Sequence, residues 1–271
     1  MTISFQKMNG AGNDFVVVDN RDRNLPLDRA TIARLCDRHR GIGADGLLAV
    51  EPAEGGADFR MRYYNSDGGE AEMCGNGARC FARFAAGLLP EPPASISFET
   101  QAGIIGARFP SEGQVTINMS EPHGFRPPEC LELAGESLDV HFLNTGVPHA
   151  VSFVADVEAV DLPRLGSALR WHPNFAPKGT NTNFAQVAAP GRLVLRTFER
   201  GVEAETLACG TGVCATALLH HLATAAPSPV SVLVRGGDTL QVGFEEVGPG
   251  EFRNVTLTGP ADFVFSGNIS V

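Results

Sequence analysis

Met73-Cys74-Gly75-Asn76-Gly77-Ala78-Arg79-Cys80 is a short stretch whose pattern returns as Ala208-Cys209-Gly210-Thr211-Gly212-Val213-Cys214. Both stretches read Cys-Gly-x-Gly and continue into small and apolar residues at helical spacing. A glycine directly after a cysteine leaves backbone N–H groups accessible, so a ligand can approach closely. If a helix begins there, its N–H groups and its dipole favour negative charge, on a thiolate as well as on a bound carboxylate. The pattern therefore predicts a thiolate beside an anion-binding position, built twice.

The spacing of the two stretches indicates an internal duplication. Cys209 lies 135 positions after Cys74, and the same offset relates Glu205 to Glu70. A repeat of this length is the size of a domain, unlike the short units of solenoid proteins. We therefore predict an α+β fold with two similar domains, each a curved, mostly antiparallel, β-barrel-like sheet around a central α-helix.

The domain boundaries follow from this duplication. The first domain is predicted to hold residues 1–119 with Cys74, joined by the last strand, 262–271, and the second to hold residues 120–261 with Cys209. The proline-rich stretch 121–128 is the best linker candidate. Because two like domains leave a cleft, a common place for a small-molecule site, we expect one cysteine from each domain to face a single ligand.

Hydrophobic periodicity and turn residues predict the main elements. Helices are expected at 31–39, 78–85, 162–171 and 213–223, and the last of these is apolar nearly all round, which predicts that protein surrounds it. Strands are expected at 3–8, 15–18, 47–50, 59–64, 140–143, 150–154, 184–187, 193–198, 230–234, 239–244, 254–258 and 263–269, with hairpins between 95 and 119.

Composition excludes several classes of protein. The net charge of −10 and pI of about 5.2 argue against nucleic-acid binding. No apolar run is long enough to span a membrane, and the N-terminus lacks the features of a signal peptide, so we expect a cytoplasmic protein. Six cysteines in a chain of 271 residues do not form a disulfide scaffold. Four of them are expected to be buried small hydrophobes: Cys36, Cys80, Cys130 and Cys214.

The sequence also argues against a metal and against the common organic cofactors. A zinc site favours closely spaced cysteine or histidine pairs, and the chain has no C-x-x-C. Lys7 and Lys178 are the only lysines, which disfavours a lysine-anchored cofactor. The glycine motifs do not follow a strand in the order that dinucleotide binding requires. We expect no metal and no cofactor.

Two equivalent thiols suit the inversion of a carbon that bears a hydrogen. One base removes the proton from one face, an acid returns a proton to the other, and the two exchange roles in the reverse reaction. A thiol near a helix N-terminus can serve in either role at neutral pH. The N–H groups of Gly75, Asn76, Gly210 and Thr211 would hold the substrate carboxylate while charge develops on it.

At these motifs the sequence resembles the diaminopimelate epimerases, over nearly the whole chain. The similar stretches are Gly10–Phe15, Gly41–Gly46, Asn65–Gly68, Cys74–Cys80, Gly146–His149, Gly179–Asn181, Glu199–Gly201 and Ala208–Gly212. The resemblance implies two barrel-like domains and interconversion of LL- and meso-2,6-diaminoheptanedioate, which feeds lysine and peptidoglycan precursor synthesis. It also implies an isomerase that uses no cofactor, acts on a small molecule and forms a possible homodimer.

By this resemblance Cys74 and Cys209 are the acid and base. The other residues fall into two groups: pKa-modulating His149 and Glu199, and substrate-binding Asn13, Asn65, Gly75, Asn76, Asn181, Glu199, Arg200, Gly210 and Thr211. Two positions depart from the pattern of some members, which carry Gln in place of Gly46 and Asn in place of Val147, and no contact is assigned to them. The alternatives are a proline or hydroxyproline racemase and, in a different class, a thiol redox protein or a non-catalytic binding protein.

Overall fold

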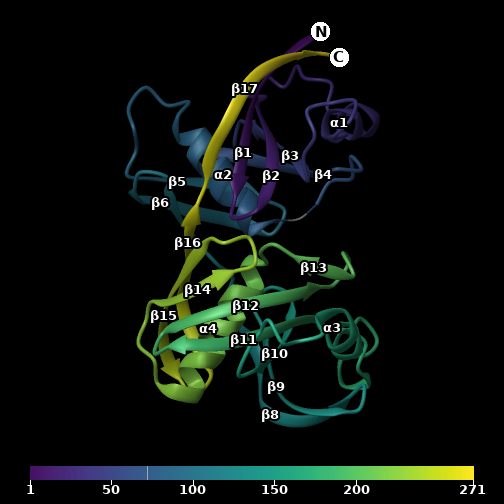
Figure 1. Ribbon diagram of the computed structural model, residues 1–271. Coiled ribbons are helices and arrows are strands. Elements are labelled where there is room, and N and C mark those ends of the chain that lie inside the picture. Colours follow the sequence, from purple (N-terminus) through teal and green to yellow (C-terminus); the bar gives the residue numbers. More distant parts are fainter. Residues whose placement is uncertain (72) are drawn as a thin grey trace. The chain divides into compact units, whose positions relative to one another are not determined.

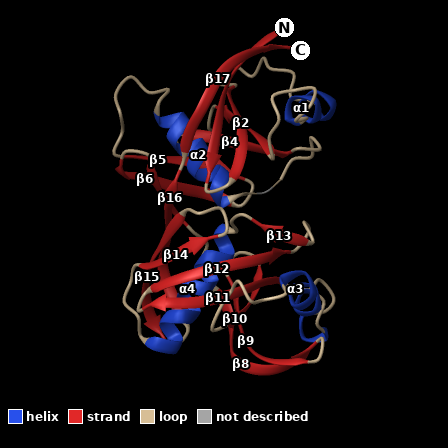
Figure 2. Ribbon diagram, in the orientation of Figure 1, coloured by secondary structure: helices blue, strands red, loops and turns tan. Residues whose placement is uncertain are grey.

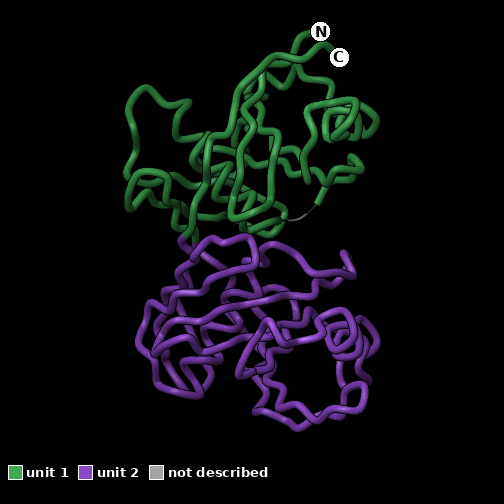
Figure 3. Tube along the Cα trace, in the orientation of Figure 1, with its two compact units in different colours: residues 1–117, 259–271 green, residues 118–258 purple. Residues whose placement is uncertain are grey.

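The chain folds into two compact units, coloured separately in Figure 3. The computed structural model describes residues 1–71 and 73–271. The first unit comprises Met1–Ile117 and Gly259–Val271, and the second comprises Asn118–Thr258. No helix in these described ranges is both long and apolar enough to cross a membrane.

The first unit is a curved sheet whose last strand comes from the C-terminus of the chain. In Figure 1 the final yellow strand runs beside the purple first strand, and their register pairs Thr2 with Ser270. Its strands, in spatial order, are β17 (Asp262–Ser270), β1 (Thr2–Gly10), β2 (Asn13–Asp19), β3 (Gly46–Glu51), β4 (Phe59–Asn65), β5 (Ser95–Thr100), β6 (Gly103–Ser111) and β7 (Gln114–Asn118). The pairings β2–β3 and β4–β5 are parallel, and the others in this series are antiparallel.

The second unit repeats this plan. Its strands, in spatial order, are β8 (His123–Leu133), β9 (Glu136–Asn144), β10 (Pro148–Phe153), β11 (Asn181–Ala189), β12 (Arg192–Glu199), β14 (Val230–Val234), β15 (Thr239–Gly248) and β16 (Glu251–Pro260), while the short β13 (Ala204–Thr206) also pairs with β12. The parallel pairings, β10–β11 and β12–β14, fall at the positions of those in the first unit. The predicted fold class, with its duplicated sheet, is confirmed.

One long helix packs against the strands of each sheet, and both helices are labelled in Figure 2. These helices are α2 (Gly75–Ala86) and α4 (Gly210–Thr224). Helix α2 contacts β1 to β6, and α4 contacts the corresponding strands of the second unit. Residues 212–220 of α4 are all buried, which confirms that protein surrounds this apolar helix.

A smaller core lies on the opposite face of each sheet. In the first unit, helix α1 (Arg29–Cys36) covers one side of β2 and β3. In the second unit, α3 (Leu162–Arg170) covers one side of β11 and β12 and is followed by the short helix η1 (Pro173–Phe175). The middle strands are therefore buried on both faces, which explains their continuous apolar runs. Alternate residues of each such strand face the central helix and the outer helix.

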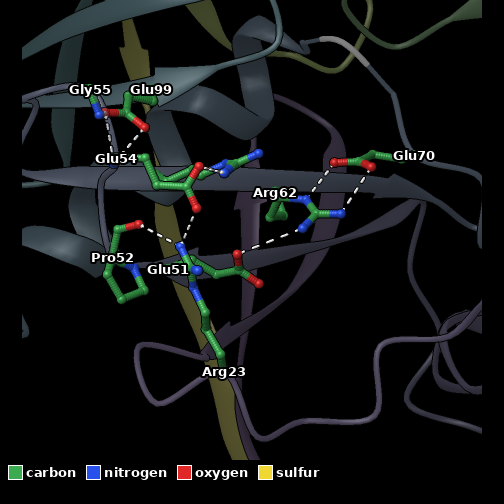
Figure 4. A network of polar contacts seen from close by, with 9 residues as sticks. Arg23, Glu51, Pro52, Glu54, Gly55, Arg62, Glu70 and Glu99 are labelled. Atoms are coloured by element: carbon green, nitrogen blue, oxygen red, sulfur yellow. Dashed lines mark hydrogen bonds and ion pairs between the residues drawn. The ribbon is translucent and has the colours of Figure 1, made fainter.

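An arginine–glutamate ion pair precedes each Cys-Gly-x-Gly motif. Arg62 of β4 binds Glu70 through two hydrogen bonds of 2.5 and 3.0 Å, as Figure 4 shows. Arg196 of β12 binds Glu205 in the same two-pronged way, at 2.7 and 3.0 Å. Such planar pairing fixes direction as well as distance. Each pair therefore fixes the side chain of the glutamate that stands four residues before the cysteine.

Two expectations from the sequence are wrong. The proline-rich stretch 121–128 is not a linker, because its larger part opens β8, where an edge strand tolerates prolines. Cys130 is exposed, since the alternation of β8 turns Leu131 and Leu133 into the core and Cys130 away from it. Cys36, Cys80 and Cys214 are buried as predicted.

The first predicted helix is displaced. Helix α1 spans residues 29–36 instead of 31–39, because the Asp28 side chain accepts hydrogen bonds from the backbone N–H groups of Ala30 and Thr31. These bonds satisfy the free donors of an earlier first turn.

Candidate active site

Cys74 and Cys209 occupy the same structural position, the residue immediately before a central helix. Both have extended backbone angles, and neither helix N-terminus is capped by a hydrogen bond from its N-cap side chain. Cys74 is half-buried, and Cys209 is 8% exposed. By contrast, burial raises the pKa of Cys80 to about 12, so this neighbouring thiol stays protonated. The position before a central helix therefore distinguishes Cys74 and Cys209 from Cys36, Cys80 and Cys214.

Polar side chains form a chain beside Cys74, which we call the Cys74 cluster: Asn13, Asp45, Asn76 and Arg79. Arg79, fully buried, donates to Asn76 Oδ1 at 2.8 Å, and Asn76 Nδ2 donates to Asn13 Oδ1 at 2.7 Å. Asn13 Nδ2 in turn donates to Asp45 Oδ2 at 3.0 Å. The structure thus brings Asn13 and Asn76 together and fixes their amide orientations.

Asn65 differs from these two asparagines. It ends β4, opposite Gly46 of β3, and it is exposed. In the described ranges its side chain has no hydrogen-bond partner, and only its backbone is engaged, with Gly68 and Gly69. Its amide is therefore available to a ligand.

The Cys209 cluster, which we define as Thr145, His149, Asn183, Thr197, Cys209 and Thr211, has a different composition. Thr211 Oγ1 lies 3.5 Å from Cys209 Sγ and 2.9 Å from His149 Nε2. Thr145 donates its hydroxyl hydrogen to the Thr211 carbonyl at 2.8 Å, which holds the first turn of α4. His149 thus reaches Cys209 through Thr211.

His149 itself lies beneath the helix, completely buried. Its Nδ1 is 3.1 Å from Asn183 Nδ2, and burial, aided by the positive charge of Arg200, lowers its pKa to about 3. A side chain at Gly212 would not fit, because an added Cβ would lie 2.6 Å from Asn183 Oδ1 and 3.3 Å from the His149 ring. Gly212 therefore lets α4 approach the buried pair.

The remaining predicted residues lie at one edge of the β11–β12 pair: Asn181 begins β11, Glu199 ends the antiparallel β12, and Arg200 follows it. Asn181, 4% exposed, accepts from the Arg200 N–H at 2.9 Å and donates to the Pro148 carbonyl at 3.1 Å, so it holds the backbone that carries Arg200. Burial raises the pKa of Glu199.

Arg200 carries an available positive charge. In the described part of the chain its guanidinium forms no ion pair, whereas nearby Arg170 and Arg196 each bind a glutamate. A half-buried guanidinium without a carboxylate partner is suited to an anionic ligand.

The predicted residues thus fall into two groups, one in each unit. Five residues of these clusters escaped the sequence analysis as functional positions: Asp45, Arg79, Thr145, Asn183 and Thr197. Arg79 lies inside the Cys74–Cys80 motif. Asparagine is depleted in strands, so Asn183, directly before the predicted strand that begins at Phe184, could have been noticed as unusual.

Comparisons with known proteins agree with these motifs. The family model described as diaminopimelate epimerase matches residues 5–124 and 141–264. The chain is similar to a diaminopimelate epimerase of Aromatoleum aromaticum, 44% identical over 100% of both chains, and to one of Aquifex aeolicus, 42% identical over 99% of this chain and 98% of the relative.

Solved structures of low sequence identity share the fold. A phenazine biosynthesis protein of the PhzF family from Bacillus anthracis matches with a TM-score of 0.73 at 17% identity, over 100% of both chains. A probable proline racemase from Agrobacterium radiobacter matches with a TM-score of 0.68 at 18% identity, over 99% of this chain and 92% of the other.

The burial of neutral His149 predicts a specific loss of stability in acid. Its pKa falls from 6.5 to about 3 on folding, so below about pH 6.5 the unfolded chain binds a proton that the folded chain does not. The free energy of unfolding should therefore decrease as the pH falls through this window, by about 2 kcal/mol between pH 7 and pH 5 from this residue. Urea unfolding of the wild type and of His149→Gln at both pH values measures the difference, and equal losses in the two proteins would contradict it.

Proposed function

The chain belongs to the diaminopimelate epimerase family, and from this premise we propose that it interconverts LL- and meso-2,6-diaminoheptanedioate without a cofactor. Cys74 and Cys209 are the acid and base of the proposed mechanism, which serves lysine and peptidoglycan precursor synthesis. The observation that carries the mechanism is the placement of both cysteines at the N-cap of a central helix, once in each of two duplicated units.

The chemistry asks for two groups of equal kind. A thiolate removes the α-hydrogen, the resulting carbanion spreads its charge onto the α-carboxylate, and the second thiol delivers a proton from the opposite face. Each thiol leaves the reaction in the protonation state in which the other began. In the reverse direction the roles are exchanged, which explains the need for two residues of matched acidity.

Backbone donors support the developing charge in this proposal. The N–H groups of Gly75, Asn76, Gly210 and Thr211 lie in the first turns of α2 and α4, where helical carbonyls offer them no partner. A carboxylate bound there gains hydrogen bonds and the favourable end of the helix dipole. These interactions strengthen as negative charge grows on the carboxylate, so they favour the transition state.

Side chains would hold the rest of the substrate. Arg200, whose guanidinium forms no ion pair within residues 1–71 and 73–271, is suited to the distal carboxylate, and exposed Asn65 offers an amide donor and acceptor. Asn13, Asn76 and Asn181 stand within hydrogen-bonded networks and would present the donors that those networks leave unused. Glu199 would accept the reacting ammonium group, and His149 would adjust Cys209 through Thr211. We also propose a cytoplasmic location, because both thiols must remain reduced.

Isotope exchange tests the activity. Incubation of the LL isomer in deuterated water, without added metal or pyridoxal phosphate, should yield meso product with deuterium at the α-carbon, because the returned proton comes from a thiol that has exchanged with solvent. NMR of the stereoisomers measures both events. Racemisation of proline with no turnover of diaminopimelate would assign the chain to the racemase alternative instead.

Serine replacements test the division of work between the thiols. Cys74→Ser and Cys209→Ser should each lower epimerisation by several orders of magnitude in both directions, since a hydroxyl is a far weaker base at neutral pH. With a β-fluoro analogue, removal of one proton allows fluoride to leave, so no opposite acid is needed. Each variant should then retain elimination toward one α-configuration, opposite for the two proteins.

This second test needs folded variants, shown by circular dichroism, and fluoride release as the readout. If one variant eliminates from both configurations and the other from neither, a single residue performs the chemistry.

A homodimer is the last part of the proposal. Strand β17 exposes Phe263, Val264 and Phe265, and in the described ranges β1 is the strand that pairs with it. An apolar strand with an unpaired edge favours association with a second copy. Light scattering after size exclusion should give twice the chain mass, and Val264→Lys should lower it. A wild-type protein that elutes as a monomer at micromolar concentration would contradict this.

A further inference from the structure

A directional chain of hydrogen bonds runs beneath the N-terminus of α4. It connects Thr197, Asn183, His149, Thr211 and Cys209, all within the second unit. Asn183, His149 and Thr197 are at most 3% exposed. Buried polar groups are costly unless each is paired, so the direction of every bond in such a chain is constrained.

The backbone fixes the orientation of the Asn183 amide. Asn183 Nδ2 lies 3.0 Å from the Ala150 carbonyl, which can only accept a hydrogen bond. This atom must therefore be the amide nitrogen, and Asn183 Oδ1 accepts from the Thr197 hydroxyl at 3.0 Å. The second hydrogen of the same nitrogen points to His149 Nδ1 at 3.1 Å.

This orientation decides the tautomer of His149. Because Nδ1 accepts from Asn183, the neutral ring carries its hydrogen on Nε2. Nε2–H then donates to Thr211 Oγ1 at 2.9 Å. Thr211 keeps its own hydroxyl hydrogen, and a thiolate at Cys209 Sγ, 3.5 Å away, can only accept it. A hydrogen bond donated to sulfur favours the thiolate.

The first unit shows that the fold itself does not need this chain. Beneath Gly77, the equivalent of Gly212, an added Cβ would meet Phe15 at 3.3 Å and Leu48 at 3.5 Å. Phe15 corresponds to His149 and Leu48 to Asn183, because Phe15 pairs with Gly46 in the parallel register in which His149 pairs with Asn181. The same space is thus filled by apolar side chains on the Cys74 side and by a polar pair on the Cys209 side.

We propose that Asn183 is a positioning residue that locks His149 in the Nε2–H tautomer, so that Thr211 donates to the Cys209 thiolate and prepares Cys209 as the base of the resting enzyme. The proposal rests on the two-thiol function above. Its tests use no diaminopimelate. A wrong substrate assignment would therefore leave their results unchanged, whereas a wrong account of the hydrogen bonds beneath Cys209 would not.

The tautomer is measured directly. Long-range ¹H–¹⁵N correlation spectra of the ¹⁵N-labelled protein, with the His149 signals assigned from their loss in His149→Gln, should show a neutral ring protonated on Nε2 at neutral pH. A ring protonated on Nδ1, or an imidazolium, would overturn the proposal.

The effect on the thiol is measured by alkylation. Asn183→Leu introduces the residue type that the first unit has at the equivalent position, Leu48, and removes the hydrogen-bond donor to His149. Iodoacetamide at neutral pH should then modify Cys209 about tenfold more slowly than in the wild type, the loss expected for one hydrogen bond to a charged group. Mass spectrometry of the separate peptides follows both cysteines, and Cys74 in the same sample should keep its rate within about twofold.

Thr197→Val is the matched control, because it removes a buried hydroxyl from the same chain but leaves the Ala150 carbonyl to orient the Asn183 amide. Its Cys209 alkylation rate and its His149 tautomer should equal those of the wild type. Equal slowing of Cys209 in Thr197→Val and Asn183→Leu, or no slowing in Asn183→Leu, would show that Asn183 acts only through packing and would overturn the proposal.

Discussion

The close approach of each central helix to the floor of its sheet is the constraint on which both cysteine positions depend. At Gly212 the distance leaves no room for a Cβ, and at Gly77 an added Cβ would be in tight contact with Phe15. A second close contact occurs at Gly10, where a Cβ would lie 2.7 Å from the Asn76 carbonyl. The third residue of each central helix is therefore glycine, and the N–H groups of this first turn have no helical carbonyl as partner.

Duplication supplied two such positions, and divergence made them chemically different. The order and sense of strand pairing are the same in the two units, and both arginine–glutamate pairs persist. The floor beneath the helices is not the same. Phe15 and Leu48 fill it in one unit, and His149 and Asn183 in the other. Because apolar packing satisfies the fold, the polar pair, which is costly to bury, is best explained by a task at Cys209.

A different set of hydrogen bonds lies beside Cys74. Buried Arg79 runs along α2 and donates to Asn76, which leads through Asn13 to Asp45. Here a charged group behind the motif orients two amides, whereas a neutral histidine does the work beside Cys209. The two cysteines thus stand in unlike surroundings, a buried charge on one side and a neutral hydrogen-bonded pair on the other.

The sequence by itself determined the duplicated fold class, the two helix N-termini and the family, because each rests on local pattern: glycines after a cysteine, apolar periodicity and a fixed offset. It did not predict that Cys130 is exposed, that the proline-rich stretch forms part of a strand, or that Asn183 contacts His149. These depend on which face of a strand meets which helix, and that is decided by register between segments far apart in the chain. Asn183 meets His149 only because β10 and β11 pair in parallel, with His149 beside Asn181. A one-residue shift would turn the asparagine to the opposite face of the sheet, away from α4, so only the tertiary structure could reveal the hydrogen-bond chain to Cys209.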